Sequence, residues 1–314
     1  MVAPRTGGAR GVGTLDRPPG TDIALIVVAV CAVSTSAPLI RVAAAPAFAV
    51  AFWRNGLASL LLTPVALARC RAELLALSRH ELSLAVGAGV LLAAHFATWV
   101  PSLSFTPVAS SVALVATQPI WAALIARVRG ERVPRRAWLG IVVAVAGAVV
   151  LTGVDLRINA RFLLGDVLAM AGGVFAAAYV TVGAEVRRSV STTSYTLLCY
   201  ATAGVLLLVC CVTTHQRLVG YSAKTWACLA GLTLGAQLLG HSVFNRVLRT
   251  TSPTVVSLAI LFEIVGAAVL AAILFSESPP LAAIPAALLI GAGIVVVVRA
   301  GRAEPAVAGV AVVE

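Results

Sequence analysis

The sequence predicts an all-α integral membrane protein with ten transmembrane helices, arranged as two inverted five-helix repeats. Three observations support this fold class: the composition, the spacing of apolar segments and an internal repeat. The chain has 314 residues, of which 60% are hydrophobic and 11% are charged, and its mean hydropathy is +1.02. Soluble domains are about 45–50% apolar and about 25% charged. A water-soluble globule of this size could not bury so much apolar surface.

The apolar segments have the length that a bilayer requires. A spanning helix needs about 20 mostly apolar residues, because the hydrocarbon core is about 30 Å thick and a helix rises about 1.5 Å per residue. A cleaved signal peptide is the alternative for the first segment, but its long preceding tail and the similar segments that follow favour a retained helix. The predicted spans are approximately 22–40, 47–68, 82–101, 108–126, 137–153, 164–184, 191–213, 225–245, 254–274 and 280–299.

The basic residues predict the orientation of the chain. With ten crossings and a cytoplasmic N-terminus, seventeen of the 23 Lys and Arg residues fall on the cytoplasmic side, five fall on the other side and Arg54 lies within a span. This bias follows the positive-inside rule. We therefore expect a multi-pass protein of the cytoplasmic (inner) membrane, with residues 1–20 as a disordered cytoplasmic tail and residues 301–314 as a second one. Topology also explains the net charge of +11, so no nucleic-acid partner is expected.

The internal repeat appears when the chain is shifted by 146 residues, which superimposes two segments without a gap. It predicts one copy in residues 21–153 and a second in residues 164–300. Five crossings per copy place the second copy upside down, the arrangement on which alternating access depends, with substrate sites near the midplane between the copies. The matched pairs are Gly89 with Gly235, His95 with His241, Pro107 with Pro253, Ser111 with Ser257, Glu131 with Glu277, Pro134 with Pro280 and Gly147 with Gly293.

Two motifs carry a resemblance to a known family. Residues 108–133 (VASSVALVATQPIWAALIARVRGERV) and 138–151 (WLGIVVAVAGAVVL) resemble the EamA-like family of the drug/metabolite transporter superfamily, and residues 254–297 resemble its second copy. The resemblance implies ten helices, inverted repeats and movement of small organic metabolites, often outward. The second copy of the family commonly has Glu followed by Pro in the ninth helix, but Glu263 is not followed by proline. A proline-dependent kink there has no support in this sequence.

Charged side chains inside spans are candidate site residues, because each costs about 2.5–3.5 kcal/mol at a helix centre on insertion scales. Glu263 either carries a coupling proton or binds a substrate amine; alternatively, it pairs with Arg54 or bonds nearby backbone. Arg54 could bind a substrate carboxylate through its planar guanidinium, but its place near one end of its span favours snorkelling to the interface. Gln118, in the fourth predicted helix, is a further candidate.

Polar stripes mark the third and eighth predicted helices. Gln237, His241 and Asn245 recur at i, i+4 and i+8, which places them on one helix face. His95 and Trp99 lie on the equivalent face of the repeat partner. Polar stripes facing lipid would be costly, so both are expected to face a central cavity. The histidines line that cavity, relay protons or form interhelical hydrogen bonds.

The function expected from these features is secondary transport. The sequence has no G-x-S-x-G, Walker or H-E-x-x-H motif and its six cysteines have no metal spacing, so no catalytic residue, metal or cofactor is predicted. We expect an exporter of amino acids, metabolites or drugs that works by alternating access, with the proton as one candidate coupling ion. The alternatives are an intramembrane enzyme or lipid-handling protein using His and Glu at the midplane, or a receptor or scaffold. Both monomer and homodimer are compatible with the sequence.

Overall fold

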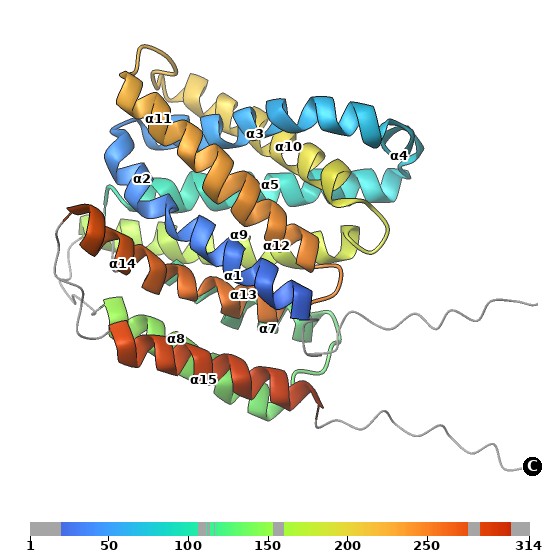
Figure 1. Ribbon diagram of the computed structural model, residues 1–314, viewed down its shortest axis with the longest axis vertical. Coiled ribbons are helices and arrows are strands. Elements are labelled where there is room, and N and C mark those ends of the chain that lie inside the picture. Colours follow the sequence, from blue (N-terminus) through green and yellow to red (C-terminus); the bar gives the residue numbers. More distant parts are fainter. Residues whose placement is uncertain are drawn as a thin grey trace, which may run out of the picture.

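The computed structural model describes residues 20–105, 111, 114–115, 117–152, 160–275 and 283–302, and within these ranges every regular element is a helix (Figure 1). Pro107, Glu277 and Pro280 of the internal repeat, and most of both predicted tails, lie outside the described residues. The helices are α1 (Gly20–Ser34), α2 (Ser36–Ala43), α3 (Ala47–Arg69), α4 (Arg71–Ala76), α5 (Arg79–Ser102), α7 (Gln118–Val128), α8 (Arg135–Thr152), α9 (Ala160–Val186), α10 (Thr192–Thr213), α11 (Ala223–Gly231), the π-helix η1 (Leu232–His241), α12 (Ser242–Val247), α13 (Pro253–Ile260), α14 (Phe262–Phe275) and α15 (Ala283–Arg302).

Six helical runs in the described part of the chain are long and apolar enough to cross a membrane. Two shorter apolar helical segments, Pro253–Ala267 and Ile284–Ala300, overlap the ninth and tenth predicted spans, and α7 and α8 overlap the fourth and fifth. The count of ten therefore stays a prediction. The six longer runs are Gly20–Ala43, Ala47–Arg69, Arg79–Ser102, Leu163–Val186, Thr192–Thr213 and Ala223–Val247.

Serine residues start several helices where the sequence changes from polar to apolar. The Ser78 hydroxyl accepts a hydrogen bond from the Glu81 backbone N–H at 3.2 Å, and the Glu81 carboxylate accepts one in return from the Ser78 N–H. Ser191, Ser222 and Ser252 cap α10, α11 and α13 in the same way through the N–H three residues on. Each such cap contributes about 1 kcal/mol.

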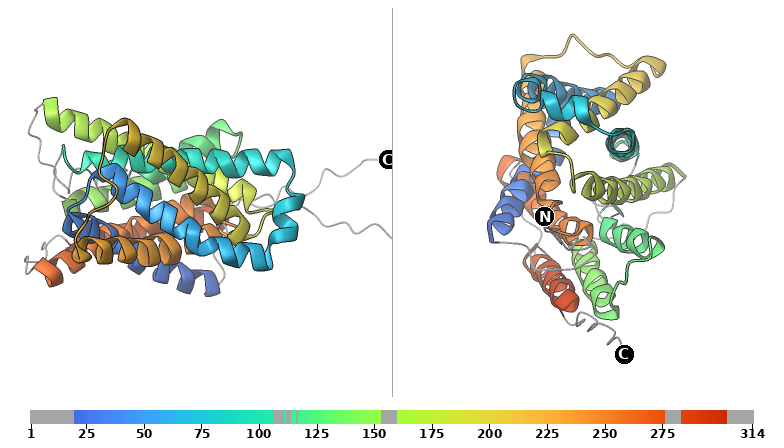
Figure 2. Two further views of the ribbon diagram at one scale, coloured as in Figure 1. Left: turned by 90° about the horizontal axis from the view of Figure 1, so that it is seen from above. Right: turned by 90° about the vertical axis from the view of Figure 1, so that its right-hand side faces the viewer.

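Helices from the two halves of the chain pack in matched sets (Figures 1 and 2). The pairs α3–α10, α7–α13 and α8–α15 each join corresponding helices, and the α5–α9 contact has its counterpart in α1–η1. Figure 1 shows that α1 and α9 run in opposite directions, as do α8 and α15. The α8–α15 backbones approach so closely at Gly140 that an added Cβ would lie 2.7 Å from the Gly293 carbonyl oxygen. Only glycine permits this approach.

The outer surface is apolar and the interior carries the polar side chains. Leu60, Val142 and Leu288 are each more than half exposed, whereas Arg54 and Gln237 are fully buried. This distribution suits a lipid solvent, because hydrocarbon penalises exposed polar groups and not exposed leucine.

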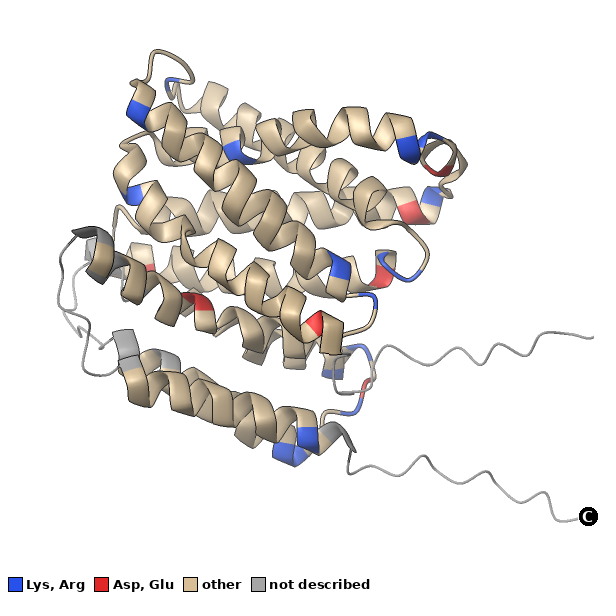
Figure 3. Ribbon diagram, in the orientation of Figure 1, with Lys and Arg blue, Asp and Glu red and all other residues tan. Residues whose placement is uncertain are grey.

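Lys and Arg gather at one end of the bundle, where α4, the α12–α13 connection and the end of α15 lie (Figure 3). At this end the Glu73 carboxylate accepts hydrogen bonds from the Ser191 N–H and the Ser194 hydroxyl, both at 2.6 Å. Polar contacts therefore join the first half of the chain to the second at the Arg-rich end.

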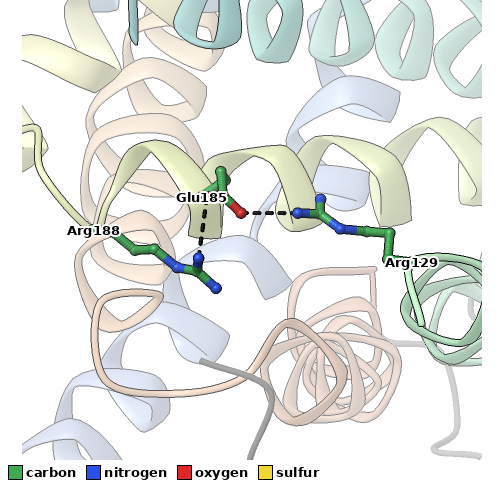
Figure 4. A network of polar contacts seen from close by, with 3 residues as sticks. All are labelled: Arg129, Glu185 and Arg188. Atoms are coloured by element: carbon green, nitrogen blue, oxygen red, sulfur yellow. Dashed lines mark hydrogen bonds and ion pairs between the residues drawn. The ribbon is translucent and has the colours of Figure 1, made fainter. Parts of the chain in front are cut away.

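A second contact between the halves at this end is an ionic cluster (Figure 4). Glu185 of α9 pairs with Arg129, just after α7, at 2.8 Å and with Arg188 at 3.1 Å. These side chains are 27–46% exposed, so solvent screens the pairs and each contributes at most about 1 kcal/mol.

Candidate functional site

A cavity of about 80 Å³ lies between the two halves of the chain. α5 contributes His95 and Trp99 to its wall, η1 contributes His241, α12 contributes Asn245 and α14 contributes Glu263. Typical ligand pockets measure about 300–1,000 Å³, and a single water needs about 10–15 Å³. In this conformation the cavity therefore has room for several waters or a small polar group.

His95 has a fixed tautomer and a stacked neighbour. Its Nδ1 lies 2.9 Å from the Gly172 carbonyl oxygen, and because a carbonyl only accepts, Nδ1 carries the hydrogen and Nε2 is the acceptor of the neutral ring. The imidazole stacks on the Trp99 indole, with ring centroids 5.5 Å apart and planes 13° apart. Gly172 makes room for this pair, since an added Cβ would lie 3.0 Å from the Trp99 Cβ.

The eighth segment contains a π-helix that divides its predicted polar stripe. The Ser242 N–H donates to the Gln237 carbonyl oxygen, one residue further back than in an α-helix. This wider turn changes the angle between successive residues, so the i, i+4, i+8 relation no longer gives one face. His241 and Asn245 line the cavity, whereas Gln237 is buried behind it against α3. π-helical turns are frequent at functional sites.

Arg54 is 1% exposed, so the expectation that it snorkels to the interface is wrong. Its Nε donates to Gln237 Oε1 at 2.8 Å and its Nη1 donates to Ser36 Oγ at 3.3 Å. The guanidinium carbon also lies 4.3 Å from the centroid of the Phe96 ring, a cation–π contact. The neighbouring helices supply partners inside the bundle, and these hold the side chain there.

Ser36 reaches Arg54 because the first span is interrupted. α1 ends at Ser34 and α2 begins at Ser36, with the Thr35 hydroxyl bonded to the Ala32 carbonyl at 2.7 Å. Pro38, in the first turn of α2, has no N–H to continue the α1 hydrogen bonds. Ser36 also lines the cavity, so the cavity wall is in direct contact with the Arg54 guanidinium.

Glu263 follows an interruption of the ninth segment at Leu261. The Leu261 N–H bonds to the Leu258 carbonyl and the Ile264 N–H bonds to the Leu261 carbonyl, both at 3.2 Å. Each bond reaches back three residues, one fewer than in an α-helix. A break in this helix therefore forms without the Glu-Pro pair. It places Glu263 in the first turn of α14, where the helix dipole favours a carboxylate.

Glu263 and Arg54 lie within electrostatic range of each other. Among the described contacts, no hydrogen bond joins the two side chains. Arg54 Nη2 and Trp99 Nε1 are buried donors without a partner among the described residues, and leaving such a donor unpaired costs about 1–3 kcal/mol. The site thus combines a carboxylate on the cavity wall with donors that have spare capacity.

Gln118 and Tyr179 complete the polar lining. Gln118 Nε2 donates to Ser257 Oγ at 3.0 Å, which connects α7 with α13 across the two halves. The Tyr179 hydroxyl donates to Asn245 Oδ1 at 2.8 Å. Within the described residues, no group of three or more His, Cys, Asp or Glu side chains is placed to hold a metal ion.

The family model for EamA-like transporters matches residues 21–153 and 163–299. The chain belongs to the EamA-like transporter family. The family is one of membrane transporters of small solutes, and the cavity described above lies between the two matched segments.

The fold has a counterpart among solved structures. A crystal structure described only as that of a protein superimposes with a TM-score of 0.75 at 20% identity, covering 90% of this chain and 98% of the other. At this identity the likeness shows a shared fold alone. A search of curated proteins finds no match.

Sequence reasoning overlooked several parts of this EamA-like site. Ser36 and the Phe96 ring next to Arg54 were not among its candidates, and neither was the π-helix. Pro38 was a usable signal, since proline inside an apolar span interrupts helical hydrogen bonds. The π-helix has no comparable signal, because its sequence also suits an α-helix.

Proposed function

We propose that the chain is a secondary transporter that exports small organic solutes, amino acids first among them, across the cytoplasmic membrane by alternating access. One observation carries the proposal: Glu263 and Ser36 line a cavity between the two repeats, and Ser36 accepts a hydrogen bond from the buried Arg54 guanidinium, whose Nη2 has no partner among the described residues. An amino acid has the complementary pair of groups. Its carboxylate would accept from Arg54, and its amine would donate to Glu263.

The interrupted helices support the alternating-access part of the proposal. α1–α2 breaks at Thr35, α13–α14 breaks at Leu261 and η1 adds a wide turn, so three segments around the cavity have points at which they can bend. Ten spans in two inverted copies would let one half take the conformation of the other and so expose the cavity to the opposite side. The polar contacts at the Arg-rich end would then have to separate in each cycle.

Orientation and coupling belong to the same proposal. The Arg-rich end would face the cytoplasm by the positive-inside rule, with both termini on that side. Glu263 is the proposed carrier of a coupling proton, because a carboxylate at this depth is more easily accommodated in its neutral form.

Reconstitution in liposomes tests this function. We expect counterflow of at least one solute from an amino-acid and metabolite panel. We expect Arg54→Gln to weaken the binding of carboxylate-bearing solutes by about tenfold or more, since hydrogen bonds to charged groups contribute about 1.5–3 kcal/mol. Lys224→Gln removes an exposed charge far from the cavity wall and is the matched control. No flux for the whole panel would count against transport, and turnover of a solute in detergent would favour an intramembrane enzyme instead.

A further inference from the structure

A second and larger cavity, of about 780 Å³, forms a groove between α1, α13–α14 and α15. All of its lining residues are apolar or small except Arg299. Ile23, Val27 and Val295 on its walls are 41–56% exposed, so the groove opens to the surroundings of the bundle. α15 lies beside α8 (Figure 1) and also contacts α13 and α14, so it forms one wall of the groove.

Arg299 is the charged group of this groove. Its side chain is exposed and makes no hydrogen bond or ion pair with the residues that the structure describes. Asp22, which precedes Ile23 on the α1 wall, is buried and accepts a hydrogen bond from Thr250. That carboxylate is therefore engaged elsewhere, and no described carboxylate compensates the positive charge of the groove.

The length of the groove matches one leaflet of a bilayer. Its α1 wall extends from Ile23 to Cys31, which is about 12 Å along a helix at about 1.5 Å per residue. Half of the hydrocarbon core is about 15 Å. Arg299 follows Val298 of the groove in the last turn of α15, and this end of α15 lies at the Arg-rich end of the bundle (Figure 3). An acyl chain in the groove would thus have its headgroup at this arginine.

We propose that this groove binds an anionic phospholipid from the leaflet on the Arg-rich side, with an acyl chain against α1, α14 and α15 and the headgroup phosphate on Arg299. The apolar walls exclude a soluble polar ligand, and an unpaired guanidinium favours a phosphate, with which it forms charge-assisted hydrogen bonds. The lipid would fill the space that separates α15 from α1 and α14. This site is independent of the central cavity and of the solute that the transporter carries.

Native mass spectrometry of the purified full-length protein tests the headgroup part of the proposal. We expect phosphatidylglycerol to bind more tightly than phosphatidylcholine. Arg299→Gln should lower the affinity for phosphatidylglycerol about fivefold, the factor corresponding to the ~1 kcal/mol that one basic side chain contributes near an anionic surface. Arg136→Gln removes an exposed charge from the first turn of α8, outside the groove, and should leave binding unchanged. Equal binding of the two lipids, or equal losses in the two variants, would overturn the proposal.

A groove-filling variant tests the acyl-chain part. Val27→Trp adds bulk at a half-exposed position of the groove, so it should reduce the binding of both phospholipids, whereas Val142→Trp, on the exposed face of α8, should not. The same spectra report the oligomeric state. If Val27→Trp dissociates a dimer and leaves lipid binding intact, a second copy of the chain covers the groove and the lipid site is excluded.

Discussion

Arg54 owes its position to the side chains around it. A guanidinium one turn or two inside a span can reach the interface with its long stem, and nothing in the local sequence forbids this. The side chain instead turns inward because Gln237, Ser36 and the Phe96 ring together supply acceptors and a π-face. Removing one partner of a buried charge destabilises the fold more than removing one partner of an exposed charge, since the buried charge is left without compensation.

Glu263 is the residue whose role is most sharply testable. If it carries the coupling proton, Glu263→Gln should abolish pH-driven transport and leave counterflow exchange partly intact, because glutamine keeps the shape of the side chain but cannot release a proton. Flux in liposomes with and without a pH gradient measures this. Glu131→Gln, in the turn between α7 and α8, is the control and should behave like the parent. Equal proton-driven rates in Glu263→Gln and the parent would remove Glu263 from the coupling mechanism.

At the scale of helical elements, the cavity depends on interruptions in otherwise apolar segments. The interruptions take three forms: a break followed by Pro38 between α1 and α2, i→i−3 hydrogen bonds at Leu261, and the wide turn of η1. A continuous α-helix would rotate the residues that follow by about 100° for each residue gained or lost. His241 and Glu263 would then leave the cavity wall.

The break before Glu263 predicts an asymmetric response to proline. Ile264→Pro should cost less than proline in the middle of the helix. It loses the packing of a buried isoleucine, but position 264 is in the first turn of α14, where the backbone accommodates proline, and its N–H makes only an i→i−3 bond to Leu261. Val269→Pro, in the middle of α14, should cost about 3 kcal/mol or more, because it removes an interior hydrogen bond and clashes with the preceding turn. Thermal unfolding in detergent compares the two variants. Equal destabilisation by both would show that α13 and α14 act as one continuous helix.

At the scale of the whole molecule, the contact of Glu73 with Ser191 and Ser194 fastens the two halves together at the Arg-rich end. Burial alone would raise the pKa of Glu73, but the hydrogen bonds from Ser191 and Ser194 outweigh it and hold the pKa below its ordinary value of 4.5. A carboxyl group whose pKa is lowered on folding contributes stability that is complete above the ordinary pKa and is lost as the pH falls through the folded pKa.

The Glu73 contact therefore predicts a pH-dependent difference between variants. At pH 7, Glu73→Gln should lower the free energy of unfolding by about 1 kcal/mol, the size expected for partly exposed hydrogen bonds that lose their charge. The difference should shrink as the pH falls from 4.5 through the lowered pKa of Glu73, below which the folded parent carries a neutral carboxyl as well. Thermal unfolding of both proteins across this pH range checks the prediction. A constant difference at all pH values would contradict it.

The arrangement of the bundle also predicts where the ends of the chain lie. An even number of crossings would leave both termini on the side of the Arg-rich end, which the positive-inside rule predicts to face the cytoplasm. Reporter fusions at each terminus, one active only inside the cell and one only outside, give the location directly. Opposite locations for the two termini would mean an odd number of crossings and would rule out paired five-helix repeats.

The amino-acid sequence by itself determined the class, the repeat and the family. Hydropathy over segments of about 20 residues depends on composition alone, and the family model matches both predicted copies. It also identified His95, His241, Asn245, Trp99, Gln118 and Glu263, which the fold brings to one cavity, because polar groups in apolar segments are conspicuous without any structure.

Only the tertiary structure decided how those residues meet. The inward turn of Arg54, the separation of Gln237 from His241 by a π-helix and the groove beside Arg299 all depend on contacts between segments far apart in the chain. Sequence periodicity describes one helix at a time. The direction of a buried polar side chain is chosen by the partners on neighbouring helices, since an unpaired polar group in a low-dielectric interior is too costly to leave alone.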